Sequence, residues 1–385
     1  PSIALYCGRN EGNPPETLNK ALREQTSLLD GTRLYIPHSA TGTVSGFGPY
    51  SVQNPRHYFK IRTHRKLHSE MGMPNIPSIE SMKKMLPEDK YWPVNDVWGL
   101  HDFCIHSAQG ASGFMNAVNR YGKASDLQDF CKKAQMVNME NHKAMFESFV
   151  GAQSNGMLMW MSQSAWPSTV WQTYDYYLDQ TAGYYGCKKA LEPLHILWDS
   201  QLDKVKVANN TRQGYKNLIA EVLIYNMDGT LMLRDSVRLY GKKKKPTDLS
   251  PVHFIKLELK DGNKIIADNF YWRGNKYQEY SDLSNMLPAD LQYSLYREKS
   301  GGKVFLTVDI KNAGKNIALM TRLKVLRDRS KERVLPVYYS DNYFSLLPGE
   351  TKQVILEFNA KDLQGENPVL GIEGWNIDYM EIVEF

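Results

Sequence analysis

The sequence predicts an α/β first half followed by an all-β second half. Up to about residue 198, short apolar runs alternate with segments of helical periodicity. Strands that are apolar on both faces and alternate with helices are typical of a parallel sheet, as in a barrel or a doubly wound fold. After about residue 199, short alternating strands are separated by turn signals, and this pattern with few helices indicates β-sandwiches.

The first half begins with strand and helix signals in alternation. Residues 2–7 form a short apolar run, which predicts a buried strand. Pro14 and Pro15 then begin a helix, because proline is tolerated in the first turn, and apolar residues follow at near-helical spacing: Leu18, Ala21, Leu22, Leu28 and Leu29. Residues 33–37 and 67–70 are two further predicted strands. Residues 41–55 form a long loop rich in Gly, Ser and Pro, of the kind that builds sites.

The remaining elements complete the predicted domain organisation. Residues 125–128 resemble a capping box and begin a helix with a continuous apolar side. Residues 156–161 predict a strand that is apolar on both faces. In the second half the clearest strands are residues 218–225, 254–259, 304–310 and 353–358. We expect three units, with residues 1–198 forming the α/β part, 199–287 a first sandwich and 288–385 a second.

Composition excludes several classes of protein. Of the 385 residues 42% are hydrophobic and 23% charged, and no apolar run approaches the roughly 18 residues of a membrane span. The net charge is only +5, and the two basic stretches, residues 60–66 and 242–245, are expected to be solvated, so neither a membrane nor a nucleic-acid partner is predicted. The four cysteines lack metal-ligand spacing, so we expect neither a metal nor a cofactor.

Two glutamates lie where a barrel enzyme places its catalytic groups. Glu11 follows the first predicted strand and Glu70 ends the third, and the C-terminal ends of barrel strands face the loops that form the site. Two carboxylates facing one pocket are what glycoside hydrolysis requires, one as a general acid and one as an ionised nucleophile. A single strand-end glutamate is more often a structural ion-pair partner, so the hypothesis depends on the pair.

Several motifs, in order along the whole chain, resemble one enzyme family. The family is glycoside hydrolase family 2, in its β-mannosidase and exo-β-D-glucosaminidase branch. The segments that resemble it are Arg9-Asn10-Glu11, residues 69–78 around Glu70, residues 156–168, residues 174–193 and Ala267-Asp268-Asn269-Phe270-Tyr271-Trp272. The resemblance implies the C-terminal part of a (β/α)8 TIM barrel, strands 4–8, followed by two immunoglobulin-like β-sandwiches.

The resemblance also implies roles for individual residues. Glu11 would be the general acid/base and Glu70 the nucleophile of a double displacement. Asn10 would position the 2-substituent of the sugar, and Trp160 would stack beneath the ring unless it is an ordinary core tryptophan. Three weaker candidates for substrate binding are His38, Tyr50 and Trp166. His38 could equally be a satisfied loop histidine, and Tyr50 is placed to orient Glu70.

Departures from the family leave alternatives open. The glucosaminidase branch often uses Asp as acid/base, whereas Glu11 stands here, which favours a mannosidase-like enzyme without deciding the sugar. The family's N-terminal domains and first three barrel strands have no counterpart, so we expect the isolated chain to be nearly inactive and to need a missing N-terminal portion or self-association.

The resemblance implies secretion or periplasmic export. The alternative function is a non-catalytic carbohydrate-binding or scaffold protein.

Overall fold

The computed structural model describes residues 2–61, 66–104, 110–161, 163–237, 248–274 and 279–383. Most of the basic stretch at residues 60–66, and all of the one at 242–245, falls outside these residues. Among the described helices, none combines the length and the apolar character needed to cross a membrane.

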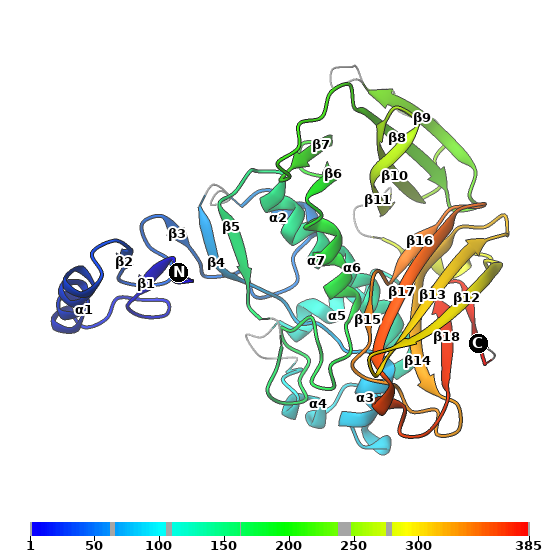
Figure 1. The fold of residues 1–385 in the computed structure, drawn as a ribbon, viewed down its shortest axis with the longest axis horizontal. Coiled ribbons are helices and arrows are strands. Elements are labelled where there is room, and N and C mark those ends of the chain that lie inside the picture. Colours follow the sequence, from blue (N-terminus) through cyan, green and yellow to red (C-terminus); the bar gives the residue numbers. More distant parts are fainter. Residues whose placement is uncertain are drawn as a thin grey trace.

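The chain begins with a small α/β unit that projects from the rest of the molecule (Figure 1). Strands β1 (Leu5–Cys7) and β2 (Leu34–Ile36) pair in parallel, and helix α1 (Glu16–Leu29) connects them. The helix predicted after the two prolines is therefore present. The predicted burial of residues 2–7 is wrong, because Cys7 is exposed, β1 has only β2 as a partner, and α1 buries none of its residues.

A second parallel sheet contains the other strands of the first half. Its order is β3-β4-β5, formed by β3 (Val44–Ser45), β4 (Leu67–Met71) and β5 (Gly156–Met159). The expectation that residues 156–161 are apolar and buried on both faces is wrong, since Leu158 is 58% exposed. The physical reason is position, because β5 is an edge strand of this sheet. In the described residues the two parallel sheets are separate and form no closed barrel.

Helices pack around this second sheet and fill the core of the first half. They are α2 (Pro55–Tyr58), α3 (Ile79–Met85), α4 (Asp96–Leu100), α5 (Ala111–Asn119), α6 (Leu127–Val150) and α7 (Ala182–Ala190). The long α6 is almost entirely buried and packs along α7. The sequence places its N-terminus correctly to within one residue. The N-cap is Asp126, whose carboxylate accepts the Asp129 backbone N–H at 2.9 Å.

The second half is a pair of β-sandwiches, as predicted. The first stacks the hairpin of β6 (Leu194–Asp199) and β7 (Lys204–Asn209) on a sheet of order β11-β10-β8-β9. That sheet is antiparallel and consists of β8 (Ile219–Asn226), β9 (Leu231–Val237), β10 (Val252–Asp261) and β11 (Lys264–Gly274). Strand β6 starts at Leu194, ahead of the predicted unit boundary after residue 198, and Ile196 lies in the core of this sandwich.

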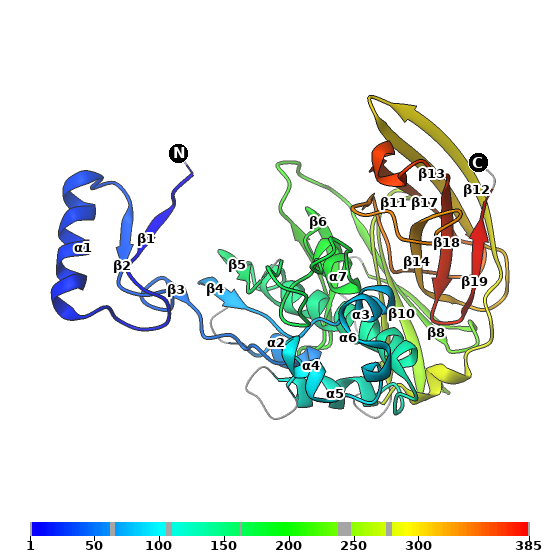
Figure 2. The ribbon, with the colours of Figure 1, turned by 90° about the horizontal axis from the view of Figure 1, so that it is seen from below.

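The last sandwich contains two four-stranded antiparallel sheets (Figure 2). One has the order β12-β13-β17-β15, from β12 (Leu291–Ser300), β13 (Lys303–Asn312), β15 (Tyr338–Tyr339) and β17 (Thr351–Asn359). The other has the order β16-β14-β18-β19, from β14 (Ala318–Arg327), β16 (Phe344–Leu346), β18 (Pro368–Gly374) and β19 (Ile377–Ile382). Alternate residues of β13 and β17 are buried in the core, as the period-2 pattern requires, whereas consecutive residues of β14 and β18 are buried.

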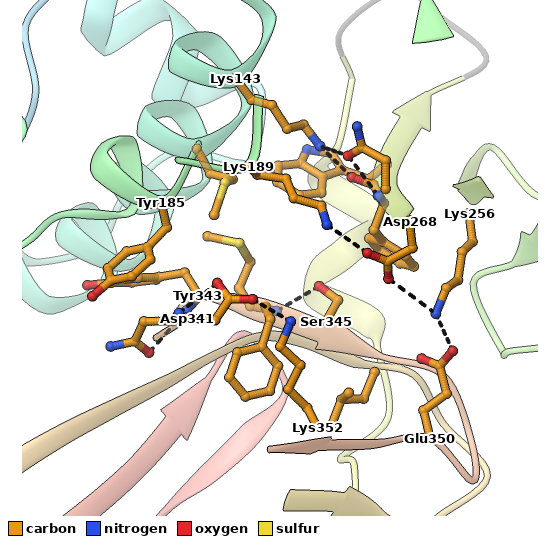
Figure 3. Close-up of a pocket in the computed structure, with 18 of the residues that line it drawn as sticks. Lys143, Tyr185, Lys189, Lys256, Asp268, Asp341, Tyr343, Ser345, Glu350 and Lys352 are labelled. Carbon is orange, nitrogen blue, oxygen red and sulfur yellow. Dashed lines mark hydrogen bonds and ion pairs between the residues drawn. The ribbon is translucent and has the colours of Figure 1, made fainter. Parts of the chain in front are cut away.

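Ion pairs join the helices to both sandwiches. A cavity of about 380 Å³ lies at one junction. Figure 3 shows Asp268 of β11, which lines this cavity, between Lys189 and Lys256. Lys189 of α7 lies 2.6 Å from the Asp268 carboxylate, and Lys256 of β10 lies 3.9 Å from it and also pairs with Glu350. The motif containing Asp268, which resembles the glycosidase family, is therefore part of a domain junction.

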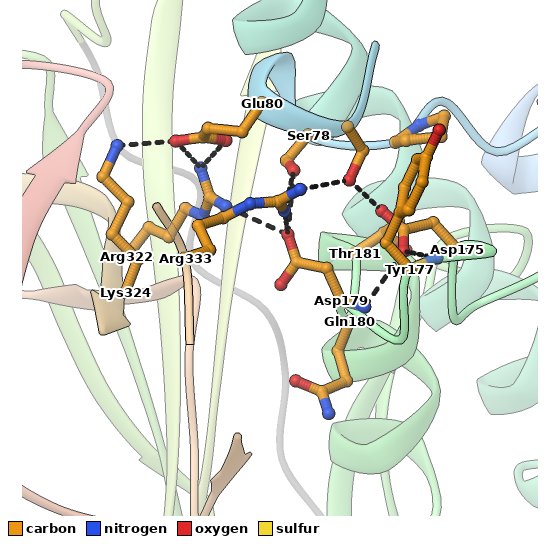
Figure 4. A network of polar contacts seen from close by, with 12 residues as sticks. Ser78, Glu80, Asp175, Tyr177, Asp179, Gln180, Thr181, Arg322, Lys324 and Arg333 are labelled. Carbon is orange, nitrogen blue, oxygen red and sulfur yellow. Dashed lines mark hydrogen bonds and ion pairs between the residues drawn. The ribbon is translucent and has the colours of Figure 1, made fainter. Parts of the chain in front are cut away.

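A second junction is a buried charge network between the loops of the first half and the last sandwich (Figure 4). Arg322 of β14 contacts Glu80 of α3 at 3.1 Å and Asp179 at 3.2 Å. Arg333 contacts Asp179 at 2.6 Å, and its guanidinium also reaches Ser81 at 2.8 Å. Removing one partner from such a network leaves the others as buried, uncompensated charges. The network therefore fixes how the last sandwich sits against the loop that follows β5.

Asp175, whose carboxylate accepts a hydrogen bond from the Ser81 hydroxyl of this network, makes folding stability depend on pH. Burial, and then the neighbouring Asp179 carboxylate, raises the pKa of Asp175 to about 6. The folded state therefore binds this proton more tightly than the unfolded chain, so the contribution of Asp175 to stability improves as pH falls from above 6 towards 4. Relative to wild type, we expect Asp175→Asn to be more stable at pH 8 and to lose that advantage by pH 4. Denaturant unfolding at several pH values measures this difference, and a pH-independent difference would contradict it.

Candidate active site

The β1–β2 pair holds Glu11 at the end of the projecting unit. Residues Arg9 to Glu11 follow β1, and Ser39 follows β2, so the two segments leave the parallel pair at the same end. Ser39 then ties them together. Its backbone N–H donates to the Arg9 carbonyl at 3.1 Å, and its hydroxyl oxygen accepts the Glu11 N–H at 3.0 Å. The same hydroxyl donates to the Asn10 side-chain oxygen at 3.0 Å. Both Asn10 and Glu11 are exposed.

Glu70 lies on β4, and Tyr50 bridges it to Glu11. Strand β4 is the central strand of its sheet, and Glu70 is only 9% exposed. The Tyr50 hydroxyl contacts Glu11 Oε1 at 2.5 Å and also contacts Glu70 Oε1. Because both carboxylate oxygens touch one hydroxyl oxygen, they can be no more than about 5 Å apart. This upper limit is smaller than the roughly 6.5–9.5 Å between the carboxyl groups of inverting glycosidases and agrees better with the roughly 5–5.5 Å of retaining ones.

The environment of Glu70 raises the pKa of its carboxyl group. Burial is the largest cause that raises the pKa of Glu70, the Tyr50 hydroxyl partly offsets it, and the proximity of Glu11 raises it further. Burial and both carboxylates also raise the pKa of Tyr50, so this phenol stays protonated at neutral pH. Tyr50 has one proton to donate, so one carboxylate at a time receives its hydrogen bond. The raised pKa falls on Glu70, whereas a retaining glycosidase needs its nucleophile ionised, so the assignment of Glu11 as acid and Glu70 as nucleophile comes from the family resemblance and not from this pKa.

Contacts that the sequence did not reveal hold Tyr50 in place. Trp171 donates its indole N–H to the Tyr50 carbonyl at 2.9 Å, and the two ring centroids are 6.1 Å apart. His68 of β4 lies between Ser45 Oγ and the Gly48 carbonyl, each at 2.9 Å. Trp171 is one of eight tryptophans, and no spacing signal distinguishes it. Its role follows only from the fold, which brings residue 171 beside residue 50.

Trp160 extends the strand that neighbours Glu70. Its backbone N–H donates to the Met71 carbonyl at 2.9 Å, and its side chain is 38% exposed. Its ring centroid lies 6.2 Å from that of Trp171. Gly72 allows this approach, because a Cβ at Gly72 would lie 1.7 Å from the Trp160 carbonyl oxygen. The position of Trp160 at the end of β5, beside β4, puts an aromatic face at the same end of the sheet as Glu70.

The remaining predicted residues lie in two different places. His38 follows β2, accepts the Ala40 N–H at 3.3 Å and lies 6.3 Å from the Phe47 ring. Trp166 stacks on His101, with ring centroids 5.9 Å apart, and donates to the Leu100 carbonyl. Its contacts are thus with the segment after α4. The structure brings Asn10, Glu11, Tyr50 and Glu70 into one connected group. In the described residues no three His, Cys, Asp or Glu side chains gather as metal ligands.

Tyr50→Phe tests the coupling within this group. The Tyr50 hydrogen bond lowers the pKa of Glu70, so losing it should raise that pKa further. In its expected role as nucleophile, Glu70 would then be ionised only at higher pH, so the acidic limb of the rate profile should move to higher pH. Because hydrogen bonds to charged groups are worth about 1.5–3 kcal/mol, we expect turnover to fall roughly 10- to 100-fold. A pH profile of kcat/KM in the natural protein measures both effects, and an unmoved acidic limb would contradict the coupling.

Known proteins resemble this chain along most of its length. The chain is 27% identical to mannosylglycoprotein endo-β-mannosidase from Lilium longiflorum, over 97% of this chain and 52% of that protein. It is 32% identical to the exo-β-D-glucosaminidase from Amycolatopsis orientalis, over 78% of this chain and 33% of that protein. The pattern of the exo-β-D-glucosaminidase Ig-fold domain matches residues 269–377. The crystal structure of the Amycolatopsis orientalis exo-chitosanase CsxA superposes with a TM-score of 0.88 at 25% identity.

The chain belongs to glycoside hydrolase family 2. The superposition on CsxA covers all of this chain and 52% of CsxA, so the chain spans about half the length of that relative. The family resemblance inferred from the sequence motifs is confirmed, and so is the immunoglobulin-like character of the C-terminal part. The matched Ig-fold domain spans residues 269–377 and so includes the predicted boundary between residues 287 and 288.

Proposed function

We propose that this chain supplies both catalytic carboxylates of a retaining β-glycosidase. Glu11 acts as the general acid/base and Glu70 as the nucleophile of a double displacement. In the first step the Glu70 carboxylate attacks the anomeric carbon while Glu11 protonates the departing oxygen. In the second step Glu11 removes a proton from water, which then displaces Glu70 from the sugar. The single observation that supports this most is the Tyr50 hydroxyl that contacts both carboxylates.

The two parallel sheets belong, in this proposal, to one (β/α)8 barrel. Strands β1 and β2 would be barrel strands 4 and 5, and β3, β4 and β5 would be strands 6, 7 and 8. Support comes from apolar side chains that the described chain leaves in solvent, including Leu18, Leu28 and Leu29 of α1. Strands of a missing N-terminal portion or of a second copy would cover them. The 385-residue chain alone should then turn over aryl β-glycosides far more slowly than the natural protein.

The proposed substrates are terminal β-linked sugars of the β-mannoside or β-glucosaminide type. The named relatives act on these two classes by their names, as an endo-β-mannosidase and exo-β-D-glucosaminidases. Asn10 beside Glu11 would contact the 2-substituent, and Trp160 would stack on the sugar ring. Trp166 and His38 remain candidates for binding further units of the glycan. Secretion or periplasmic export suits a glycan substrate and is proposed on that ground.

The test is a substrate screen that also follows stereochemistry. The natural protein is assayed against aryl β-mannoside, β-glucosaminide, β-galactoside and β-glucuronide, and the first-formed anomer is identified by NMR. We expect turnover of one of the first two and a β-configured product, since the carboxylate spacing favours retention. An α-configured first product would exclude Glu70 as nucleophile. Glycan binding without turnover of any glycoside would favour the alternative, a non-catalytic carbohydrate-binding protein.

A further inference from the structure

One outer face of the last sandwich carries large exposed side chains on neighbouring strands. In the sheet β12-β13-β17-β15, the core residues Leu306, Val308 and Leu356 point inward, so their sequence neighbours point outward. The outward set includes Tyr296 of β12, 66% exposed, and Tyr338 of β15, 58% exposed. Monomeric proteins rarely leave contiguous apolar groups exposed without a function.

Strand register places these side chains beside one another. Tyr296 pairs with Thr307, which pairs with Ile355, and these three form one row across the sheet. The next row contains Phe305 of β13 and ends at Tyr338. Diagonal neighbours on a sheet lie about 7–8 Å apart, within reach of aromatic side chains. Tyr296 is therefore a diagonal neighbour of Phe305, and Tyr338 lies two strands from Phe305 in the same row, with Glu357 between them, so the three rings extend in a line from the β12 edge to the β15 edge.

Carboxylates outnumber basic groups around these rings. Three neighbouring rows cross β13 at Phe305, Thr307 and Asp309. On the outer face these rows contain three carboxylates, on Glu298, Asp309 and Glu357, and no lysine or arginine. Gln353 donates to Asp309 at 3.0 Å and fixes its orientation. Lys303, from the following row, pairs with Glu357. Aromatic faces and carboxylates attract ammonium groups by cation–π and Coulomb interactions, so the face complements a cationic ligand.

One end of this line lies near the loop that follows Trp160. Gln180 donates its side-chain amide to the carbonyl of Val337, the residue before Tyr338, at 3.0 Å, and Gln180 also bridges to Tyr174. Tyr174 in turn bridges to Gln163, three residues beyond Trp160. An extended ligand on the sheet face would therefore run towards the loop of the proposed active site.

We propose that this face binds a polymeric β-linked glycan that carries free amines, and that it holds the substrate chain near the site. This inference rests on the proposed function for the identity of the glycan. The rings would stack on sugar faces and attract protonated amines, and Glu298 would pair with one of them. Binding here needs neither Glu11 nor Glu70.

The double variant Tyr296→Ala/Tyr338→Ala tests the proposal in the natural protein. Its binding is measured by affinity gel electrophoresis, as the slowing of its migration in gels that contain a soluble β-linked glucosamine polymer. The same measurement is made with the acetylated, uncharged polymer. We expect binding to the amine polymer to weaken about tenfold, which corresponds to one or two ring contacts. Turnover of a small aryl glycoside should be unchanged, because that substrate does not reach the sheet. Tyr293→Ala is the matched control, on the same strand but on the opposite face.

Each outcome decides one part of the inference. Unchanged polymer binding in the double variant, or an equal loss in Tyr293→Ala, would overturn it. Equal binding of charged and acetylated polymer would overturn the assignment to amines, as would an unaltered affinity in Glu298→Gln. If the natural protein binds the amine polymer through this face but hydrolyses no glycoside, the proposed function fails while the binding site stands.

Discussion

Glu70→Gln is expected to lower turnover of aryl β-glycosides by a factor on the order of 10⁴ or more, because an amide cannot form the covalent intermediate. The substitution is nearly isosteric, and the Gln carbonyl oxygen can still accept the Tyr50 hydroxyl. Glu70 is buried with a raised pKa, so a neutral side chain at this place should not lower the free energy of unfolding. Steady-state kinetics and thermal unfolding of the same preparation measure the two effects.

Azide distinguishes a nucleophile from a merely structural carboxylate. In Glu70→Ala the space left by the carboxylate admits azide, which would attack the anomeric carbon directly and give the α-glycosyl azide. In Glu11→Ala azide would instead displace the sugar from Glu70 and give the β-glycosyl azide. Opposite configurations in the two variants support the assigned roles. A β-product from Glu70→Ala would contradict them.

Glu11→Gln should produce the second largest effect, and one that depends on the leaving group. General acid catalysis contributes about 10²–10⁴-fold, and only a poorly departing alcohol needs it. We therefore expect a loss of that size with alkyl or glycan leaving groups and a much smaller loss in the first step with dinitrophenyl glycosides. Activated substrates should show a burst, because the glycosyl-enzyme forms but hydrolyses slowly without the base.

A control substitution in the same small α/β unit distinguishes loss of the catalytic group from structural disturbance of that unit. Glu16→Gln changes an exposed glutamate at the start of α1, five residues from Glu11. Its kinetics should match wild type for every leaving group. A uniform loss in Glu11→Gln, equal for good and poor leaving groups, would assign Glu11 a positioning role.

Local elements could be predicted from the sequence because they leave short-range signals, and the same kind of signal singled out the two glutamates. The proline-initiated helix, the capped α6 and the alternating strands all depend on neighbouring residues. Glu11 and Glu70 stand out since each follows or ends an apolar strand. Tyr50 was found from its loop, although only the structure shows that it touches both carboxylates.

Features that depend on long-range packing could not be predicted. Trp171 supports Tyr50 across 121 residues of sequence, and Gly72 is required because the Trp160 carbonyl approaches it. The predicted burial of residues 2–7 and 156–161 was wrong for a related reason. The apolar pattern of a strand shows that it is suited to a buried position. Burial also requires other elements to cover the strand, and in the described chain nothing covers the free edges of β1 and β5.

Covalent labelling tests the central claim most directly. The natural protein is incubated with the activated 2-deoxy-2-fluoro glycoside of its preferred sugar, which slows release of the glycosyl-enzyme, and digested peptides are analysed by mass spectrometry. We predict one labelled peptide with the sugar on Glu70, loss of label in Glu70→Gln, and retained labelling in Glu11→Gln with a dinitrophenyl leaving group. Stoichiometric label on any other residue, or undiminished labelling of Glu70→Gln, would contradict the account.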